Sequence, residues 1–486
     1  MIAKTKWNND MPSILTNIYA RQRAAAISTV ISIACFSCSA FAQSLAPDER
    51  PQFHLPAAAL ASPNTENAQA SNSQRHFTSQ ELLAHPDLLM QALDSAITLE
   101  DEAALALLLS LYVQLAEKDE ILYRYGQAML ARLQGNMSQA IDLYRSILAE
   151  RPDLAPVRLQ LALALIADRQ LEAGDAQLSK LSGEDLPSEI REGIKQLQAG
   201  IAKQQEWQFS FNAHGIIDRN INDSPSQRQV GSWTFAAPET AYGLAYTLSA
   251  NKLWALDNHW HIAAQLSAHG KSFWEKHEYD DVLLRASTGA VWKDGSKEWG
   301  MLPFHERRFY GSDSYSYSNG LRLQAAWQLA RQWKWFGNYE VADNRYFSRE
   351  HLNGKSQRLS NTLLYRPNAQ QYWTFGIDVG REDAKDKSSA YDYYGLRLGL
   401  GKEWQQGIST AAQFYVLHQD YQEKDFTQIM RQDDRYGASL SLWKRDWHWQ
   451  DFSPRLVWQW KRQKSNHFAY DQQAEQSVFV EISKDF

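Results

Sequence analysis

The sequence predicts an α + β membrane protein, in which a periplasmic tetratricopeptide-like helical repeat domain is followed by a 14-stranded antiparallel outer-membrane β-barrel. Three observations support this fold class. Apolar residues recur with a helical period up to about residue 204, and from Trp207 onward they alternate with polar or small residues. Short and long connections alternate between the predicted strands. The chain ends in an alternating strand whose last residue is the aromatic Phe486.

Residues 1–42 have the three parts of a secretory signal peptide. A basic stretch precedes a short apolar stretch at 24–36, and the sequence AFA at 40–42 gives the small-x-small pattern of a cleavage site. A membrane anchor is the weaker interpretation, because the apolar stretch is too short. A lipoprotein signal is the other alternative, since Cys35 and Cys38 lie nearby, although neither follows a Leu-Ala-Gly-like triplet.

Composition excludes several kinds of site. Cys35 and Cys38 are the only cysteines, so a chain cut after Ala42 has neither a disulfide framework nor a thiolate metal site. The formal net charge is −6, whereas a nucleic-acid partner would call for a basic face, so no nucleic acid is predicted as a partner.

Residues 43–77 are rich in Pro, Ala, Ser, Asn and Gln and are predicted to be a flexible segment, because this composition cannot bury a core.

Residues 78–204 are predicted to form the periplasmic helical domain. Thr78 and Glu81 have the spacing of a capping box at its start. Two helical faces further on match the tetratricopeptide spacing, in which small residues let two helices pack closely. The repeat-packing residues are Ala128, Gly135, Ala140, Tyr144 and Pro152. Gly135 lies between the two helical faces, and Pro152 follows the second and breaks it into the next turn. A weaker unit follows at 155–186, and a further helix is expected at 188–204.

The alternative for this half is a generic helical bundle. Tetratricopeptide-like repeats are favoured, and such arrays build a concave groove that holds extended peptides or partner surfaces. The helical domain is therefore interpreted as a binding module.

Residues 205–486 are predicted to form the barrel. Trp373, Phe375, Ile377 and Val379 show the alternation, which a soluble β-sandwich would share. A membrane barrel is favoured because tight turns alternate with longer polar loops and aromatic residues gather near strand ends. The tight turns are expected near residues 257–258, 294–295, 331–332, 367–368, 406–407 and 445–446. The longer loops are expected at 218–238, 343–355, 381–390, 418–431 and 463–475. An even number of strands places both barrel ends, and with them the helical domain, on the periplasmic side.

The sequence shows no recognisable catalytic constellation. HERRF at 305–309 begins like a zinc-protease helix, but Phe309 replaces the second histidine and the stretch reads as a strand. GKS at 354–356 lacks the earlier glycine of a phosphate loop, because Arg349 stands in its place. No G-x-S-x-G elbow is present, and the histidines show no metal spacing. Neither an enzyme activity nor a cofactor or metal is predicted.

The polar stretch FHERRFYGSDSYSYSNGLRL is predicted to be two strand ends joined by a short loop at its GSD. The assignment of its side chains to the two faces of a strand is inconsistent. Strict alternation puts the apolar Leu302 and Phe304 on the same face as the charged Glu306 and Arg308. Two explanations are open. Either a β-bulge intervenes, or the charged residues stand above the lipid boundary.

Several short sequences resemble the surface lipoprotein assembly modulator family, called Slam, and they occur in the family's order. They are RPQFHL at 50–55, NIND-SP at 220–225, FHERRFYGSDSYSYSNG at 304–320, QYW at 371–373, YGLRL at 394–398, LSLWKR at 440–445 and SPRL at 453–456. The resemblance covers nearly the whole mature chain. Ser224 is a small departure, because family members more often have alanine there.

The resemblance implies a signal peptide, a periplasmic tetratricopeptide domain and a 14-stranded barrel in the outer membrane. It also implies that the protein moves specific clients to the cell surface or medium, a route also called type XI secretion. The implied partners are a surface lipoprotein or a secreted haem-binding protein, together with outer-membrane lipid, and periplasmic chaperones are a further candidate. The candidate family-motif residues are Asn220, Asn222, His305, Glu306, Arg307, Arg308 and Tyr310.

Two other functions stay open at this point. An exporter of polysaccharide also joins tetratricopeptide repeats to a barrel, although such proteins usually carry many more repeats. A passive outer-membrane channel is the second alternative, and it has no reason to carry a periplasmic binding domain. No nucleotide motif is present, so energy for export would have to come from elsewhere, for instance from folding of the client outside the cell.

Overall fold

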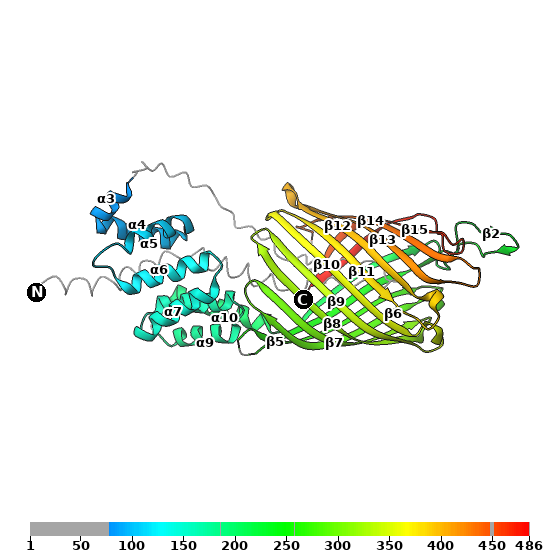
Figure 1. Ribbon diagram of the computed structural model, residues 1–486, viewed down its shortest axis with the longest axis horizontal. Helices are drawn as coiled ribbons and strands as arrows, with labels where there is room; N and C mark the ends of the chain where they lie inside the picture. The colour runs from blue at the N-terminus through cyan, green and yellow to red at the C-terminus, as the bar shows by residue number, and fades with distance from the viewer. Residues whose placement is uncertain (1–76, 185, 257, 448–451, 486) are drawn as a thin grey trace, which may run out of the picture.

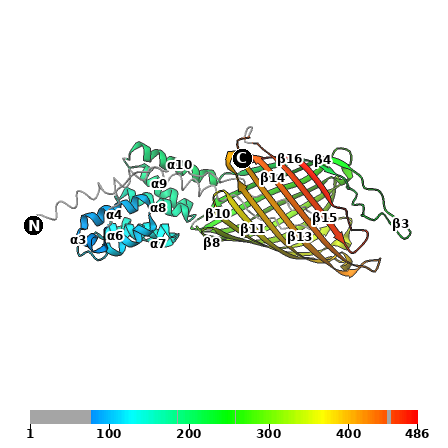
Figure 2. The same ribbon diagram turned by 90° about the horizontal axis from the view of Figure 1, so that it is seen from above.

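The computed structural model describes residues 77–184, 186–256, 258–447 and 452–485. The predicted signal peptide, and all but the last residue of the predicted flexible segment, lie outside these residues. The chain forms a helical domain and a closed barrel, which lie end to end (Figures 1 and 2). No helix among the described residues is long and apolar enough to cross a membrane.

The described part of the helical domain consists of α-helices packed in sequence. They are α3 (Ser79–Ala84), α4 (Pro86–Leu99), α5 (Glu102–Tyr112), α6 (Glu120–Leu133), α7 (Met137–Glu150), α8 (Ala155–Ala167), α9 (Leu171–Ser182) and α10 (Ser188–Gln204). The predicted capping box at the start of α3 is present, because the Thr78 and Glu81 side chains each accept from the other's backbone N–H. Asp119 likewise caps α6 through the backbone N–H groups of Ile121 and Leu122.

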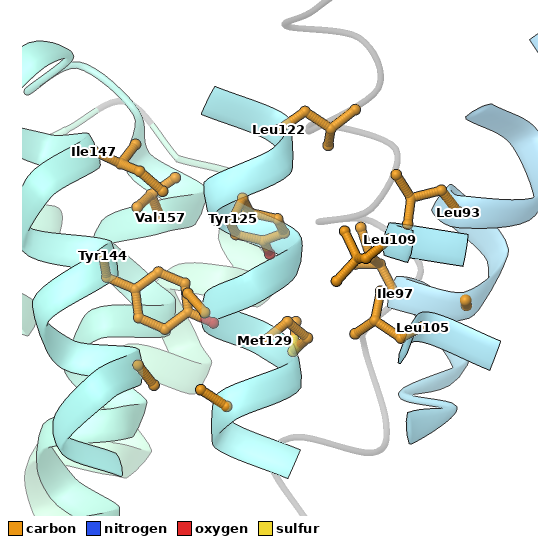
Figure 3. Close-up of a cluster of buried hydrophobic side chains, with 14 of the residues drawn as sticks. Leu93, Ile97, Leu105, Leu109, Leu122, Tyr125, Met129, Tyr144, Ile147 and Val157 are labelled. Atoms are coloured by element: carbon orange, nitrogen blue, oxygen red, sulfur yellow. The ribbon is translucent and has the colours of Figure 1, made fainter. Parts of the chain in front are cut away.

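Tyr144 lies at the centre of the helical core. Its ring packs 5.9 Å from the ring of Tyr125, measured between centroids, and both side chains are almost fully buried (Figure 3). Met129 continues this layer toward α4 and α5 (Figure 3). Gly126 lets α5 and α6 approach closely, because a Cβ there would lie 2.6 Å from Leu109 Cδ2.

The five residues of the predicted repeat signature have two different roles. Ala128, Ala140 and Tyr144 are fully buried between helices. Gly135 and Pro152 are exposed and do not pack, so assigning them to the packing was wrong. Gly135 instead takes a left-handed φ of 81° in the turn between α6 and α7, and Pro152 lies in the turn after α7.

The barrel has the predicted 14 antiparallel strands and closes by pairing β1 with β16. Its strands are β1 (Gln208–Asp218), β4 (Ala241–Ala255), β5 (Trp260–Phe273), β6 (Asp281–Lys293), β7 (Lys297–Tyr310), β8 (Asp313–Ala330), β9 (Trp333–Tyr346), β10 (Gly354–Asn368), β11 (Gln371–Glu382), β12 (Tyr391–Glu403), β13 (Ile408–Lys424), β14 (Met430–Lys444), β15 (Ser453–Ser465) and β16 (Glu475–Asp485). A short hairpin, β2 (Gln229–Val230) and β3 (Trp233–Thr234), stands in the first long loop.

Connections at the two ends of the barrel differ as predicted. The end that faces the helical domain carries the tight turns and both barrel termini, so it is the periplasmic end (Figure 1). The outer end carries the first long loop at 219–240 and the loop at 466–474. The loops expected at 343–355 and 418–431 are shorter than predicted, because β9, β10, β13 and β14 continue into the polar residues at their outer ends.

The outward face of the barrel is apolar and ends in a tryptophan girdle. Phe375, Ile377 and Val379 point outward from β11, and Val478 and Val480 do so from β16. Exposed tryptophans cluster near the periplasmic end, where amphipathic rings favour the membrane interface. They include Trp207, Trp254, Trp260, Trp299, Trp327, Trp373, Trp404 and Trp447.

In the polar hairpin at 304–323, neither of the two expected explanations accounts for apolar and charged side chains on one strand face. A register shift exists, but it lies between Arg308 and Phe309, beyond the charges that it was expected to separate from the apolar residues. Leu302 and Phe304 are buried inside the barrel, so they share the inner face with Glu306 and Arg308. Two inner-surface contacts explain this: Leu302 packs in a small apolar cluster, and the Arg285 guanidinium covers the Phe304 ring at 3.7 Å. A two-residue turn of positive φ joins the strands.

A network of ion pairs lines the inner wall from β6 to β11. One oxygen of Glu340 lies 2.5 Å from Arg285 and 3.1 Å from Arg322, and the other lies 3.9 Å from Arg358. Arg358 also pairs with Glu382 at 2.8 Å. Register explains the arrangement, because Arg322, Glu340 and Arg358 stand directly opposite one another on β8, β9 and β10. Glu340 is 3% exposed, so its charge depends on these partners.

The helical domain contacts the periplasmic turns of the barrel through the turn between α8 and α9. Asp168 Oδ2 lies 2.8 Å from His259 Nε2 in the β4–β5 turn. Ala255, at the end of β4, packs against the apolar cluster of α8 to α10. Gly295 in the β6–β7 turn is close enough that a Cβ there would lie 3.2 Å from Ala167 O. Two turns of the barrel therefore hold one turn of the helical domain.

The first prediction concerns the helical core. Tyr144→Ala should lower the free energy of unfolding of the helical domain by roughly 3–5 kcal/mol, because it removes a fully buried aromatic ring. Circular dichroism at the helical minimum during urea titration of the full-length protein isolates this domain, since the barrel contributes strands. Tyr144→Phe keeps the ring and should show a much smaller loss. Equal curves for Tyr144→Ala and the unaltered protein would contradict the packing role.

The second prediction concerns the wall network. Glu340→Gln should lower the free energy of unfolding of the barrel by about 3–5 kcal/mol, because it leaves buried arginines without their shared counter-charge. The readout is the temperature at which the folded band converts to the unfolded band in detergent gel electrophoresis. Glu423→Gln, an exposed position on β13, is the matched control and should leave that temperature unchanged. An unchanged temperature for Glu340→Gln would show that the network contributes nothing to stability.

Candidate functional site

A chamber of about 690 Å³ occupies the outer end of the barrel interior. It is built by residues at the outer ends of β1, β5, β6, β7, β8, β13, β14, β15 and β16 and by the loops between them. Because these strands alternate, each supplies every second side chain to the inside. The chamber is therefore lined by inward-facing side chains from most of the strands of the barrel.

Tyrosines and basic side chains dominate the chamber lining. The tyrosines are Tyr279, Tyr310, Tyr315, Tyr415, Tyr421, Tyr436 and Tyr470. The basic residues are Lys271, Arg308, Arg349, Arg431, Arg435, Lys461 and Arg462. The acidic residues are Asp218, Asp223, Asp281 and Glu475. Positive groups outnumber carboxylates in this lining, so its own charge is basic although the whole chain is acidic.

Arg431 is held by aromatic rings on one side of the chamber. Its guanidinium carbon lies 3.3 Å from the centre of the Tyr470 ring and 4.5 Å from that of Tyr421. Asp433, which is fully buried, accepts from the Arg431 guanidinium at 2.5 and 3.0 Å. Stacking and a bidentate ion pair together fix the orientation of this side chain.

Tyr315 organises the opposite side. Its ring centre lies 5.8 Å from that of Tyr310 and 5.4 Å from that of Tyr346. The guanidinium carbons of Arg308 and Arg349 lie 5.2 and 5.6 Å from the same ring. The hairpin at 304–323 therefore supplies a cluster of tyrosine and arginine side chains in contact, as Arg308, Tyr310 and Tyr315 all belong to it.

The structure brings some of the candidate motif residues together and separates others. Asn222, Arg308 and Tyr310 line the chamber. Glu306 faces the interior below it, where it lies 3.4 Å from Arg285. His305 and Arg307 have the opposite strand parity and are exposed on the other face of β7. His305 contacts Asn319 there at 2.8 Å, and Arg307 donates to Ser314 Oγ at 2.9 Å.

Asn220 and Asn222 shape the first long loop. The Asn220 side chain donates to Ser224 O at 2.9 Å and accepts from Ser224 N at 2.8 Å. Asn222 donates to Ala237 O at 2.8 Å and accepts from Glu239 N at 3.0 Å. Both side chains therefore replace backbone pairing that this irregular segment lacks. The NIND sequence acts mainly as a loop scaffold, and Asn222 also borders the chamber.

Charged contacts tie the outer loops to one another. Lys276 pairs with Glu239, and this hydrogen bond raises the pKa of the Lys276 ammonium. His467 Nε2 lies 2.9 Å from Asp425 Oδ2. Burial acts to raise the pKa of Asp425, but hydrogen bonds from Thr427 and the nearby His467 outweigh it and lower the pKa. These loops form a connected rim around the chamber.

Sequence reasoning missed Tyr315, Arg431 and Asp433 as parts of one site. The signal available was parity, because each lies on the polar face of an alternating strand near its outer end. Parity cannot show which strands face one another across a barrel. The Arg431–Tyr470 contact joins β14 to the loop before β16, and register alone does not predict it.

The lining of the chamber is suited to contacts with a polypeptide. Tyrosine faces and guanidinium groups can contact peptide groups, aromatic residues and carboxylates without requiring one sequence. Among the described residues, no three His, Cys, Asp or Glu side chains gather closely enough to hold a metal ion.

Comparison with known proteins identifies the family to which the chain belongs. A model described as surface lipoprotein assembly modifier matches residues 207–486, and a second, described as its N-terminal TPR repeats, matches residues 75–178. The relatives include surface lipoprotein assembly modifier 1 of Haemophilus influenzae, 33% identical over 85% of this chain and 88% of that protein. The surface lipoprotein assembly modifier of Pasteurella multocida is 30% identical over 87% of this chain and 88% of that protein.

A more distant relative bears a different name. The hemophilin secretion modulator of Acinetobacter baumannii is 23% identical over 79% of this chain and 82% of that protein. Among solved structures, Acinetobacter baumannii OccAB4 matches 58% of this chain and 99% of its own at 9% identity, with a TM-score of 0.32. The family models cover both the barrel and most of the helical domain, so the resemblance seen in the sequence motifs is confirmed. The chain belongs to the surface lipoprotein assembly modifier family, whose barrel lies in the outer membrane.

Proposed function

We propose that this protein exports specific client proteins across the outer membrane, the clients being surface lipoproteins or soluble haem-binding proteins. The observation that carries the proposal is the match of both halves of the chain to the family. The names of two relatives refer to surface lipoproteins, and a third refers to hemophilin. The two client classes follow from those names.

The position of the helical domain suits a receiving role. The α8–α9 turn is fixed to two periplasmic turns of the barrel, so a client held by the repeats would lie below the barrel opening. The candidate partners on this side are the client itself and periplasmic chaperones that deliver it. Export would draw no energy from nucleotide hydrolysis, and folding of the client outside the cell would keep it from returning.

The interior suits an unfolded chain better than a folded one. The wall network of Glu340 and its arginines projects from β6 to β11, and the chamber above it is lined by tyrosine and arginine. Such a lining contacts many sequences weakly, as a route for different segments of one client requires. A polysaccharide exporter or a passive channel is the rival account, and the experiment below separates them from protein export.

The third prediction tests protein export. Deletion of this protein from its native cell should remove one or more lipoproteins or haem-binding proteins from the surface or medium, as measured by proteomics of shaved cells and culture fluid. The protein lost most strongly is then taken as the client. Coexpression of client and exporter in a host without relatives should restore surface exposure, seen as sensitivity to protease added to intact cells. A client that stays periplasmic beside a correctly inserted barrel would contradict export.

The fourth prediction tests the contact between the two halves. Asp168→Asn removes the carboxylate that faces His259, and it should lower client export several-fold by loosening the helical domain from the barrel opening. Protease cleavage between α10 and β1 should become faster, while the heat-modified barrel band stays unchanged. Asp142→Asn on the exposed face of α7 is the matched control and should change neither readout. Full export with faster cleavage would show that fixed docking is dispensable.

A further inference from the structure

The strands that close the barrel are paired along less than half of their length. β1 pairs with β4 through all its residues from 208 to 218, but it pairs with β16 only from Ser210–Asp485 to His214–Glu481. β16 pairs with β15 from residue 475 to 483. Among the residues that the structure describes, the outer parts of the two closing strands, 215–217 and 477–480, therefore show no ladder between them. We call this stretch the open seam.

Contacts on both sides keep the open seam in place. At its periplasmic edge the His214 ring stacks on Phe479, with ring centres 4.1 Å apart. At its outer edge Ser226 N donates to Asp471 O at 2.7 Å, joining the loop after β1 to the loop before β16. A second link joins the same loops, because Gln472 Nε2 donates to Asp223 Oδ1 at 3.0 Å. The seam is thus a stretch without a ladder that is bounded by contacts on both sides.

The open seam lies in the apolar band of the barrel. Ile217 on β1 is 50% exposed, and Val478 and Val480 on β16 are 62% and 54% exposed. A Cβ placed on Gly215 would meet nothing within 4 Å. A backbone group that is left without a hydrogen-bond partner in hydrocarbon costs several kcal/mol. A partner that supplies both donors and acceptors would remove that cost.

The seam also borders the chamber. Asp218 and Asn222 on the β1 side, and Gln472 and Glu475 on the β16 side, all line the chamber. A chain segment in the chamber therefore lies beside two strand edges. Unpaired strand edges bind extended peptides by adding a strand, with main-chain hydrogen bonds giving affinity.

We propose that the open seam is a lateral binding site for an extended segment of the exported protein, which pairs as an added strand with β1, β16 or both. This inference rests on the proposed export function and names where the client is bound. An acyl chain is the less suitable occupant, because it has neither donor nor acceptor for the backbone groups of the seam. A strand supplies both, and its outward side chains would meet lipid beside Ile217 and Val478.

Photo-cross-linking during export tests the site directly. Ile217 and Val478 are each replaced by p-benzoyl-phenylalanine, and the probe is the client identified by the deletion experiment. Both positions should give a covalent adduct with the client. The matched controls, Phe375 on β11 and Leu398 on β12, are equally exposed apolar positions on a wall that is paired on both sides, and they should give none.

Three outcomes would overturn the proposal. The client could cross-link at the chamber residue Tyr421 and not at the seam, which would make the interior the whole route. The seam positions could capture lipid only, which would make lipid their cover. They could also capture the exporter's own segment before residue 77, which would make that segment the occupant. In each case export measured by protease shaving still decides the proposed function separately.

A reversible lock gives a second test. In a chain with Cys35 and Cys38 changed to serine, Ile217→Cys with Val478→Cys is joined by a cleavable bifunctional thiol reagent across the open seam. Export should fall at least tenfold and recover when the link is cleaved. The matched pair Ala213→Cys with Ile482→Cys lies in the paired half of the same seam and should leave export unchanged when linked. Unchanged export with the outer pair fully linked would contradict the proposal.

Discussion

Every backbone N–H and C=O in the hydrocarbon of a membrane needs a partner within the protein, and the rest of this structure depends on how that need is met. Thirteen of the fourteen strand-to-strand contacts meet it with long ladders, whereas the contact of β1 with β16 has five residue pairs among the described residues. The strands therefore form a closed ring, but the first and last strands are joined by a ladder over only part of their length. The weakest place in the wall is the junction of the first and last strands, beside the chamber.

The interior obeys a similar rule for charge. Glu340 is buried on the inner wall, and three arginines from β6, β8 and β10 surround it, so its charge is compensated within the protein. Asp378 and Arg397 repeat the arrangement on β11 and β12, with their charged atoms 2.5 Å apart. These ion pairs stiffen the wall opposite the seam. The wall from β6 to β12 is cross-linked by charges, whereas the junction of β1 with β16 is held by a short ladder, a ring stack and loop contacts.

Much of the fold follows from the sequence, because periodicity is a local property. The helix at 188–204, the capping box at Thr78 and the number of strands were all predicted correctly. Gly135 and Pro152 lie in the turns between and after the two repeat helices, as predicted, but grouping them with the packing residues was wrong, since a repeat spacing alone does not distinguish a buried position from a turn. Leu302 was also misleading: an apolar residue in a barrel strand is expected to face lipid, but here it fills an interior cluster with Ala263 and Val291.

The candidate site could be predicted less well, because it is made by strands far apart in sequence. Motif resemblance indicated Asn222, Arg308 and Tyr310, and these do line the chamber, but it grouped them with His305 and Arg307, which face outward. Strand parity would have separated the two sets. The seam has no signature in the sequence of either strand, since β1 and β16 both alternate like their neighbours. Only the pairing of the two ends of the barrel shows that, among the described residues, the β1–β16 ladder stops at His214, beside the strand ends that border the chamber.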